Sequence, residues 1–481
     1  MEAVVLGAGI GGMSCAALLA HNGYNVKIIE QNSSFGGKAG QLKEGGYVFD
    51  TGPSLLTLPE WIDDLFTSCA KNPRDYFNYS KLSHITRYFY ENSKQVDVVE
   101  DLDKTAQNFE QQLGLNKQIF TEYFRLWNQI YDISEKTFLK GEIKFNIAFL
   151  KSAFTWFKNT GISSVLNSMA SYNASRLNNK EVEKIMNRFA TYTGSSPYKT
   201  PAFMNQLAVV EMVKGAYFPD GGIYSIPTAL HRLCIDLGVQ FCFNEKVQKV
   251  SENFRDIIVK TTSNSYETKK LISNIDFYTT QKLLERKVKI FSENLSTSAI
   301  VFYWGVELKT PFLKLHNILF SEDYKKEFND IFKESRIPAD PTVYINISSK
   351  QDSSHAPEGC ENWFTMINIP PRPTLVNEEE INKARKYIIS LIKKKFDINL
   401  EDYIVFEELL TPKTLYDKTG AYGGALYGEH QNSLSSIMNR KPNQDKRSKN
   451  IFYVGGSVHP GGGIPLALRS GVNTAEKILK G

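Results

Sequence analysis

The feature that most constrains this chain is its N-terminal glycine-rich stretch, VVLGAGIGGMSCAALLAHNGYNVKIIEQ, from Val4 to Gln31. Residues 3–20 carry no charge, and an uncharged run of this length is a candidate for a membrane-spanning helix. The same residues contain the spacing G-x-G-x-x-G, which marks the first turn of a dinucleotide-binding fold. The two interpretations predict different proteins, and the residues that follow distinguish them.

The order of elements after the glycines favours the dinucleotide-binding fold. A membrane helix needs only length and apolarity, whereas a dinucleotide site needs a buried strand, a glycine turn, a helix and a second strand that ends in an acid. The sequence predicts a strand over Ala3–Leu6, a helix over Met13–His21 and a strand over Tyr24–Ile29. Glu30 ends the second strand at the spacing from the glycines that is typical of a ribose-binding carboxylate.

Each residue of this turn has a predicted task in holding a dinucleotide. Gly7 permits the tight turn, Gly9 lets the pyrophosphate approach the backbone, and Gly12 lets the helix lie close to the strand. Gly11 completes the turn, where free N–H groups at the helix N-terminus favour the negative phosphates. The carboxylate of Glu30 favours a ribose without a 2′-phosphate, which disfavours NADP.

Composition places the chain among ordinary globular proteins. Its 481 residues exceed one ordinary core, so two or three domains are expected. The apolar content of 42% is normal, and the net charge of +5 is too small and too dispersed to indicate nucleic acid binding. Five cysteines without a C-x-x-C pair and seven scattered histidines predict neither a disulfide framework nor a metal site. Because no secretory signal pattern opens the chain, we expect a cytoplasmic protein.

Two further glycine-rich segments indicate a flavin dinucleotide. Gly36, Gly37 and Lys38 directly follow the first β-α-β unit, and the lysine could reach the pyrophosphate. A surface loop with a solvated lysine is the alternative. Near the C-terminus, a predicted strand over Ile451–Val454 leads through a glycine cluster into a helix from about Pro465. The dipole of that helix would favour the negative charge that reduction adds to a flavin ring.

Ordered motifs along most of the chain carry a resemblance to a known family. They are GGKAGQLKEGGYVFDTGPSLLTLPE (36–60), YTGSSPYKTPA (192–202), GAYFPDGGIYSIPTAL (215–230), ISNID (272–276), DPTVYINISSKQDSSHAPEG (340–359) and YVGGSVHPGGGIPLALRSG (453–471). With these motifs the chain resembles the bacterial carotenoid desaturases of the phytoene desaturase type, which are flavoproteins similar to the amine oxidases. GPSLLTLPE, and Lys38 in place of the usual arginine, resemble the hydroxycarotenoid 3,4-desaturase branch.

The resemblance implies an α/β fold with a Rossmann-like FAD-binding domain of the glutathione-reductase/amine-oxidase type, an interleaved α+β substrate domain and a helical membrane-associating region. The FAD-binding domain would take residues 1–75, 215–285 and 436–481, the substrate domain 76–114 and 286–435, and the helical region 115–214. The residues expected to contact FAD are Gly7, Gly9, Gly11, Gly12, Glu30, Gly37, Lys38, Gly52, Pro53, Ser54, Val247, Gly455, Gly456, Ser457, Gly463, Ile464 and Pro465. Many relatives hold the ribityl chain with an aspartate near the last flavin turn. This chain has Ser457 there, which leaves the ribityl contact open.

Within the helical region, residues 143–180 contain no acidic residue. Lys144, Lys151 and Lys158 fall on one stripe of a helix. The wide opposite face carries Phe145, Phe149, Leu150, Phe154, Trp156 and Phe157. This pattern is typical of a helix that lies on a membrane surface without crossing it, and a helix packed on the protein core is the alternative. We expect a peripheral contact with the cytoplasmic membrane near residues 143–160, through which a carotenoid reaches the flavin.

The resemblance further implies an FAD-dependent oxidoreductase that acts on CH–CH groups of an acyclic carotenoid. The expected reaction is the 3,4-desaturation of a 1-hydroxycarotenoid. One hydrogen would leave as hydride to the flavin and the other as a proton. His459 is the candidate proton acceptor, with a bracing role in the glycine turn as the alternative. Glu211, Asp352 and His355 are further candidates for the cavity wall. Since no second dinucleotide turn occurs, oxygen or a quinone is the expected electron acceptor.

Other activities stay open at the level of sequence. A phytoene desaturase or a redox-neutral carotenoid isomerase or saturase would use the same fold. A non-catalytic lipid-escort protein belongs to a different class. Lys38, Gly52 and the glycine cluster of residues 455–463 argue against it, because an escort protein needs no flavin pocket. An amine oxidase would need a polar cavity, which no motif marks.

Overall fold

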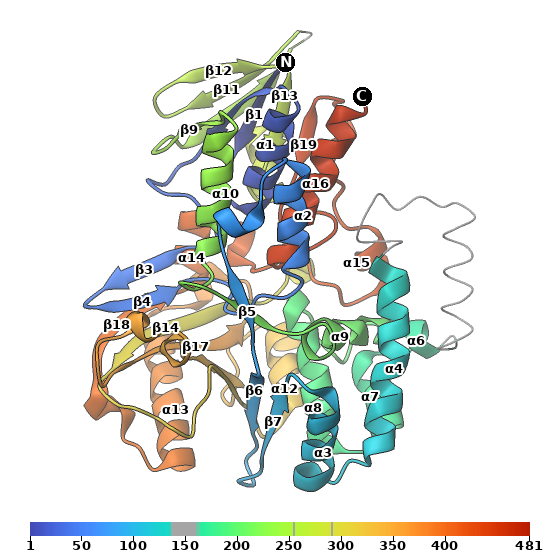
Figure 1. Cartoon of the computed structure of the whole chain (residues 1–481), viewed down its shortest axis with the longest axis vertical. Helices are drawn as coiled ribbons and strands as arrows, with labels where there is room; N and C mark the ends of the chain where they lie inside the picture. Colours follow the sequence, from blue (N-terminus) through green and yellow to red (C-terminus); the bar gives the residue numbers. More distant parts are fainter. Residues whose placement is uncertain (136–160, 162, 254, 290–291) are drawn as a thin grey trace.

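The first sheet of the molecule is assembled from three distant parts of the chain. The computed structural model describes residues 1–135, 161, 163–253, 255–289 and 292–481. Its parallel sheet has the order β19-β13-β1-β2-β9 and lies in the upper part of Figure 1. The strands are β1 (Glu2–Leu6), β2 (Asn25–Ile29), β9 (Gln240–Cys242), β13 (Lys270–Ser273) and β19 (Ile451–Tyr453). The strands predicted from the N-terminal and C-terminal motifs are therefore confirmed to within one residue.

Alternate residues of β1 face two different cores. Ala3 and Val5 pack with the helices α1, α10 and α16, whereas Val4 and Leu6 pack with the antiparallel strands β10, β11 and β12. These elements are α1 (Ile10–His21), α10 (Ser225–Asp236), α16 (Ile464–Leu479), β10 (Val247–Glu252), β11 (Ile257–Thr261) and β12 (Ser265–Thr268). Because both faces of the sheet are covered, β1 can be apolar on both faces.

Helix α1 settles the question raised by the uncharged run of residues 3–20. The run divides into β1, a glycine turn and α1, whose residues from Ile10 to Leu19 are buried in the protein. Among the described residues, no helix combines the length and the apolarity needed to cross a membrane. The order strand, turn, helix, strand expected of a dinucleotide-binding fold is confirmed.

The second sheet, in the lower part of Figure 1, has the strand order β18-β14-β17-β16-β15-β6-β7. Its elements are β6 (His84–Phe89), β7 (Gln95–Val99), β14 (Ser298–Val306), β15 (His316–Leu319), β16 (Val343–Asn346), β17 (Glu361–Ile369) and β18 (Ile404–Leu410). Every residue of β14 is buried. Ile300 and Phe302 pack on the side covered by α13 (Glu378–Phe396), and Ala299 and Val301 belong to a core on the other side.

Helices dominate residues 115–214 wherever the structure describes them. They are α4 (Lys117–Ser134), α6 (Ser163–Leu166), α7 (Met169–Leu177), α8 (Lys180–Arg188) and α9 (Gln206–Met212). Trp127, Tyr172 and Ile318 belong to one core, in which α4, α7, α8 and α9 pack together with β15. The basic segment predicted to lie on a membrane, near residues 143–160, falls outside the described residues. That prediction is therefore untested by the described residues.

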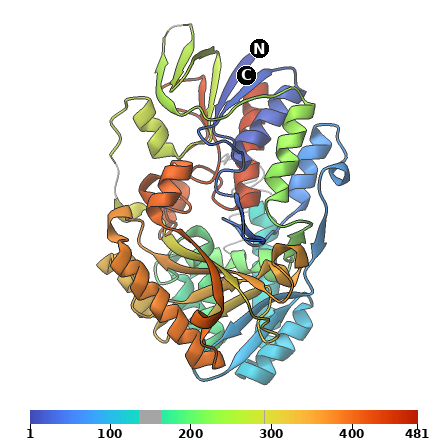
Figure 2. The ribbon, with the colours of Figure 1, turned by 90° about the vertical axis from the view of Figure 1, so that its left-hand side faces the viewer.

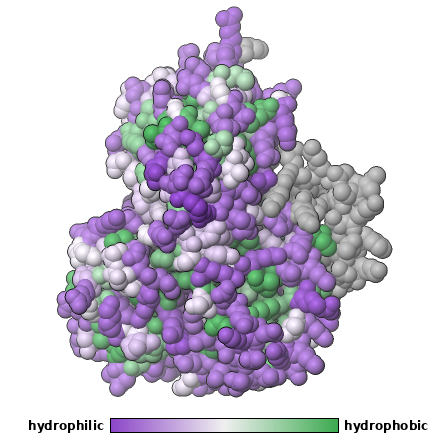
Figure 3. Space-filling model, viewed as in Figure 1, coloured by the Kyte–Doolittle hydropathy of each residue, from purple (hydrophilic) through white to green (hydrophobic). Residues whose placement is uncertain are grey.

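The two sheets define two parts of the molecule. Figure 1 and Figure 2 show both chain termini in the upper region of the part that holds the parallel sheet. The face shown in Figure 3 is mostly hydrophilic, with small, scattered hydrophobic areas on both parts. Most large apolar side chains are accordingly buried in the cores around the two sheets and the helices, including Trp127, Trp304 and Trp363.

Candidate active site

A cavity of about 1110 Å³ connects the two sheets. Gly7 and Gly455 line it from turns that follow strands of the parallel sheet. Val301 and Phe364 line it from β14 and β17 of the second sheet. The predicted dinucleotide turn and the predicted substrate side therefore open into the same space.

Of the residues expected to contact FAD, all but Gly12 line this cavity. They are Gly7, Gly9, Gly11, Glu30, Gly37, Lys38, Gly52, Pro53, Ser54, Val247, Gly455, Gly456, Ser457, Gly463, Ile464 and Pro465. Gly12 lies behind the turn, where a Cβ would meet the Gly7 carbonyl oxygen at 2.5 Å. This position agrees with its predicted task of letting the helix approach the strand.

The glycines of the first turn are required by the protein's own packing. Gly7 has φ +91°, a left-handed conformation that side chains rarely adopt. A Cβ on Gly9 would lie 2.4 Å from Nδ2 of Asn274, and one on Gly455 would lie 2.7 Å from Oδ1 of the same side chain. The amide of Asn274 thus fills the space between the first and the last glycine turn. Asn274 belongs to the motif ISNID (272–276), for which no role of this side chain was predicted.

Glu30 is a buried carboxylate at the end of β2 whose oxygens already accept three N–H groups. Ala8 N donates to Oε2 at 2.8 Å. Asn32 donates to Oε1 through its backbone N at 2.9 Å and its side-chain Nδ2 at 2.7 Å. Because each carboxylate oxygen can accept two hydrogen bonds, Oε2 keeps a place for a ribose hydroxyl.

The N-termini of α1 and α16 both lie at the cavity. Gly9 and Gly463 stand at their N-cap positions, and neither helix has a side-chain hydrogen bond there. The two helices cross so closely that a Cβ on Gly471 would lie 2.2 Å from the Gly11 carbonyl oxygen. Two sets of free N–H groups and two helix dipoles therefore favour an anion at this end of the cavity.

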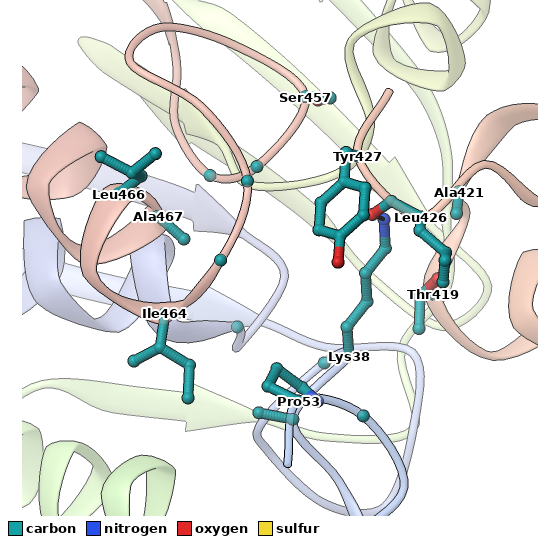
Figure 4. A pocket seen from close by; sticks show the side chains of 18 of the residues that line it. Lys38, Pro53, Thr419, Ala421, Leu426, Tyr427, Ser457, Ile464, Leu466 and Ala467 are labelled. Atoms are coloured by element: carbon teal, nitrogen blue, oxygen red, sulfur yellow. Dashed lines mark hydrogen bonds between the residues drawn. The ribbon is translucent and has the colours of Figure 1, made fainter. Parts of the chain in front are cut away.

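Lys38 reaches across the cavity to a distant segment of the chain. Figure 4 shows its side chain extending toward Leu426 and Tyr427, opposite Ile464. Its Nζ donates to the carbonyl oxygens of Ala425 at 3.2 Å and Leu426 at 2.6 Å. Burial lowers the pKa of Lys38 to about 8, and the nearby charge of Asp276 opposes that shift. The alternative of a solvated surface lysine is therefore wrong.

A second cation, Arg440, was missed by sequence reasoning. It lines the cavity and donates to the carbonyl oxygens of Val458 at 2.9 Å and Tyr427 at 3.1 Å, and also to that of Gly456. It therefore holds the last glycine turn against the segment that Lys38 contacts. Arg440 precedes the recognised C-terminal motif and stands in no glycine pattern, so the sequence offers no signal for it. Its guanidinium and the Lys38 ammonium place two cationic groups in the same cavity as the two helix N-termini.

His459 lines the cavity within the last glycine turn. Its backbone N donates to the Lys441 carbonyl oxygen at 2.9 Å, and its own carbonyl oxygen accepts from Asn443 Nδ2 at 2.8 Å. Nearby, the Ser457 hydroxyl oxygen accepts from the backbone N of Phe277 at 3.1 Å. These contacts fix the backbone of the turn; the catalytic role of His459 stays a prediction.

The wall on the side of the second sheet is largely apolar. Its apolar side chains include Leu55, Leu58, Phe203, Met204, Leu207, Val210, Val301, Ile318, Phe364, Met366 and Leu410. Glu211, Asp352 and His355 were candidates for this wall, and none of them lines the cavity. Glu211 lies behind it and pairs with Arg188, whose Nη2 is 3.3 Å from Glu211 Oε1.

Polar side chains also occur in this wall. They include Thr86, Arg188, Tyr192, His316, Tyr344 and, on helix α12 (Tyr324–Asn329), Glu327. Burial raises the pKa of Glu327 to about 7, although the hydroxyls of Thr342 and Ser321 donate to it. Burial, and then the charge of Arg188, lower the pKa of His316 to about 3. The cavity thus combines an apolar wall with a few fixed polar groups, as ligand sites commonly do.

Comparison with known proteins agrees with this arrangement. The family model of flavin containing amine oxidoreductases matches residues 10–479. The chain therefore belongs to this family. The solved structure of cyclohexylamine oxidase from Brevibacterium oxydans IH-35A covers 99% of both chains with a TM-score of 0.61 at 11% identity, which shows a shared fold. The α/β fold of the amine-oxidase type predicted from the motifs is confirmed.

Relatives that match the full length of the chain identify a narrower group within this family. The chain is 37% identical to a 1-hydroxycarotenoid 3,4-desaturase of Flavobacterium sp. (strain P99-3), over 99% of both chains. It is 29% identical to a 4,4'-diapolycopene oxygenase of Methylomonas sp, over 99% of this chain and 97% of the other. The resemblance stated from the motifs is confirmed, and the chain is a flavin oxidoreductase of the carotenoid desaturase family.

Proposed function

We propose that this chain is an FAD-dependent desaturase that introduces a C=C bond into an acyclic carotenoid, by 3,4-desaturation of a 1-hydroxycarotenoid in carotenoid biosynthesis. The observation that carries the proposal is the cavity, which runs from the glycine turns of the parallel sheet to the apolar face of the second sheet. A long apolar substrate needs such a wall next to the cofactor. The full-length similarity to a 1-hydroxycarotenoid 3,4-desaturase supports this choice of substrate.

The residues present fit FAD. Glu30 has an acceptor position left for the ribose, and Val247 lines the cavity beside it at the start of β10. The uncapped N-terminus of α1 suits the pyrophosphate. The remaining residues expected at FAD would surround the isoalloxazine and ribityl parts; they are Gly37, Lys38, Gly52, Pro53, Ser54, Gly455, Gly456, Ser457, Gly463, Ile464 and Pro465.

Bound FAD supplies a hydride acceptor for this reaction. The chain's own task is to hold the polyene straight against the cofactor and to keep water out, which the apolar wall serves. The carbon next to the one that loses hydride must lose a proton. We assign the role of proton acceptor to His459, which lines the cavity in the last glycine turn.

One experiment separates this function from the alternatives. Purified protein is reconstituted with FAD and incubated with a 1-hydroxy acyclic carotenoid and, separately, with phytoene, and product masses are determined. Loss of two hydrogens from the hydroxycarotenoid supports the proposal, and loss from phytoene alone assigns the chain to phytoene desaturation. An unchanged mass with altered geometry indicates an isomerase, and added hydrogens a saturase. Added oxygen points to the activity named for the Methylomonas relative. Failure to bind FAD would leave a lipid-escort protein.

We also propose the division into an FAD-binding domain (1–75, 215–285 and 436–481), a substrate domain (76–114 and 286–435) and a helical region (115–214). The strand composition of the sheets supports it, because the five parallel strands all come from the first set of segments and the seven strands of the second sheet from the second set. Limited proteolysis with and without FAD tests it, since FAD should protect the first set of segments most.

Membrane contact and the electron acceptor are proposed from sequence. The basic, aromatic pattern near residues 143–160 supports peripheral binding to the cytoplasmic membrane. Replacing Lys144, Lys151 and Lys158 by Gln should then weaken binding to anionic vesicles by about 1 kcal/mol per charge. With one dinucleotide turn in the sequence, oxygen or a quinone is the proposed acceptor, and turnover supported by a nicotinamide instead would contradict it.

A further inference from the structure

His316 stands in the cavity wall with one ring nitrogen satisfied and the other without a partner. It is 3% exposed. Its Nδ1 lies 2.8 Å from the Tyr344 hydroxyl and 3.1 Å from Asn346 Nδ2. Asn346 Nδ2 also donates to the Leu315 carbonyl oxygen at 3.1 Å, which identifies that atom as the amide nitrogen and Nδ1 as an acceptor. The proton of a neutral ring then sits on Nε2, which has no hydrogen-bond partner among the described residues.

Arg188 presents a second donor of the same kind. It is 8% exposed and lines the same cavity. Its Nη2 donates to the Tyr88 hydroxyl at 2.8 Å and its Nη1 to the Tyr192 hydroxyl at 3.3 Å, whereas its Nε has no partner among the residues that the structure describes. The guanidinium lies close enough to His316 for its charge to disfavour protonation of the ring. Two N–H groups of cavity-lining side chains are therefore without an acceptor in the described part of the chain, and because both nitrogens are fully enclosed, a ligand oxygen reaches them only when these side chains shift toward the cavity.

The charges around these donors indicate whether the acceptor is charged or neutral. Glu211 pairs with Arg188 and is fully buried, so the guanidinium charge is already balanced. His316 is neutral because burial opposes its protonation. An anion would bring an unbalanced charge into this wall, whereas a neutral hydroxyl oxygen offers two lone pairs for the two donors. The Tyr192 and Tyr344 hydroxyls beside these donors are already hydrogen-bonded, and Ile318, on the same strand as His316, is apolar lining.

A hydrogen-bonded chain connects His316 to the cofactor side of the cavity. The Tyr344 hydroxyl, bonded to His316 Nδ1, also lies 2.6 Å from the Ser54 hydroxyl. Ser54 directly follows Gly52 and Pro53, and Figure 4 shows Pro53 beside the base of Lys38. An oxygen held by His316 is thus held at a fixed position relative to the loop that is expected to contact FAD.

We propose that His316 and Arg188 form an oxygen subsite that binds the C1 hydroxyl of an acyclic carotenoid and so positions the neighbouring 3,4 bond for oxidation. This inference rests on the proposed function and adds the residues that select the substrate. In a 1-hydroxycarotenoid, one carbon separates the hydroxyl-bearing carbon from the bond to be oxidised. Fixing the oxygen therefore fixes that bond, and a substrate without the hydroxyl leaves two buried donors unpaired.

The test compares a 1-hydroxy acyclic carotenoid with its parent that lacks the hydroxyl, using the FAD-loaded full chain. We expect kcat/KM to favour the hydroxylated substrate by about 10- to 100-fold, the range of one or two lost buried hydrogen bonds. His316→Phe should bring this ratio close to one by lowering kcat/KM for the hydroxylated substrate alone. His316→Gln should keep part of the preference, because its Nε2 can still donate.

His355→Phe is the matched control. His355 is also buried, and its Nδ1 lies 2.7 Å from the Ser348 hydroxyl, but it does not line the cavity. It should leave the substrate ratio unchanged. If the wild type desaturates both substrates equally well, the oxygen subsite is refuted while the desaturase function stands.

Binding gives a readout that is independent of turnover. The dissociation constant of each carotenoid for anaerobic, FAD-loaded protein can be measured from the shift in carotenoid absorbance. If neither carotenoid is oxidised, the proposed function fails, and a tighter dissociation constant for the hydroxylated carotenoid, lost in His316→Phe, still supports the subsite. Equal dissociation constants in the wild type overturn it, even where His316→Phe fails to fold.

Discussion

Glu30, at the end of β2, and Glu327, on helix α12, are buried carboxylates that line the same cavity, and they are held in different ways. Glu30 accepts three N–H groups, two of them from the backbone at Ala8 and Asn32. Glu327 accepts from the hydroxyls of Ser321 and Thr342. Backbone N–H groups therefore supply most of the hydrogen bonds to Glu30, whereas two side-chain hydroxyls supply those to Glu327.

The same contrast holds for the two regions around them. Near Glu30, the contacts are made by backbone groups of glycine turns and helix N-termini, each of which is a short segment of the chain. Near Glu327, they are made by side chains such as Ser54 and Tyr344, which meet across 290 residues of sequence. The dinucleotide region therefore tolerates few changes of backbone and the second region few changes of side-chain polarity.

The largest effect should come from the backbone of the dinucleotide region. Alanine normally stabilises a helix interior relative to glycine by roughly 0.5–1 kcal/mol. In Gly471→Ala the new Cβ would lie 2.2 Å from the Gly11 carbonyl oxygen, so α1 and α16 must separate. We expect a loss of about 3 kcal/mol or more in unfolding free energy, together with loss of bound flavin, measured by urea unfolding and visible absorbance. Glu476→Ala, on the same helix, is the control and should change stability little. A Gly471→Ala protein as stable as the wild type would show that the crossing is not tight.

The second prediction concerns Glu327 and the pH dependence of stability. Its folded-state pKa is raised from 4.5 to about 7, so the folded protein binds this proton more tightly than the unfolded chain does. The resulting stabilisation is fully present below pH 4.5 and is lost as the pH rises through 7. Glu327→Gln removes the titrating group, and the loss of stability between pH 5 and pH 8 should shrink by up to about 3 kcal/mol. Urea unfolding at both pH values measures it, and an identical pH dependence in both proteins contradicts the assignment.

How far the sequence could predict the molecule follows the same contrast. The strand, turn and helix around Gly7 and the position of Glu30 after the second strand were predictable, because adjacent residues determine them. Asn274 was not assigned a role, since the glycines it packs against lie in distant segments of the chain. Arg440 was not assigned one because its partners are backbone carbonyl oxygens, which no residue pattern marks. The lining candidates Asp352 and His355 failed because a residue type alone does not show which side of a sheet it faces. His316 was not predicted as a site residue, because its lack of a hydrogen-bond partner at Nε2 among the described residues can be seen only in the folded structure.

The third prediction tests the nucleotide contact at Glu30. Glu30→Ala removes the ribose acceptor and leaves the N–H groups of Ala8 and Asn32 without their bonds. We expect the dissociation constant of FAD to rise by about 10- to 100-fold, as for a lost hydrogen bond to a charged group. Fluorescence titration of apoprotein with FAD measures it. Glu44→Ala, at an exposed position of strand β3 (Gln41–Glu44), should leave FAD affinity unchanged. An unchanged affinity in Glu30→Ala would instead mean that the carboxylate serves only the protein's own backbone.

The smallest effect should come from Lys38, the cation that joins the two regions. Its pKa is lowered from 10.5 to about 8, so the free protein loses this charge between pH 7 and pH 9. If the ammonium attracts the cofactor's phosphates, FAD affinity of the wild type should fall by roughly 3- to 10-fold over that range, as for one partly screened charge pair. Lys38→Arg keeps its charge over this range and should flatten the dependence, whereas Lys38→Met should bind FAD weakly and equally at both pH values. A fall of the same size in Lys38→Arg would exclude the charge as its cause. Lys38 would then act only by tying its loop to the carbonyl oxygens of Ala425 and Leu426.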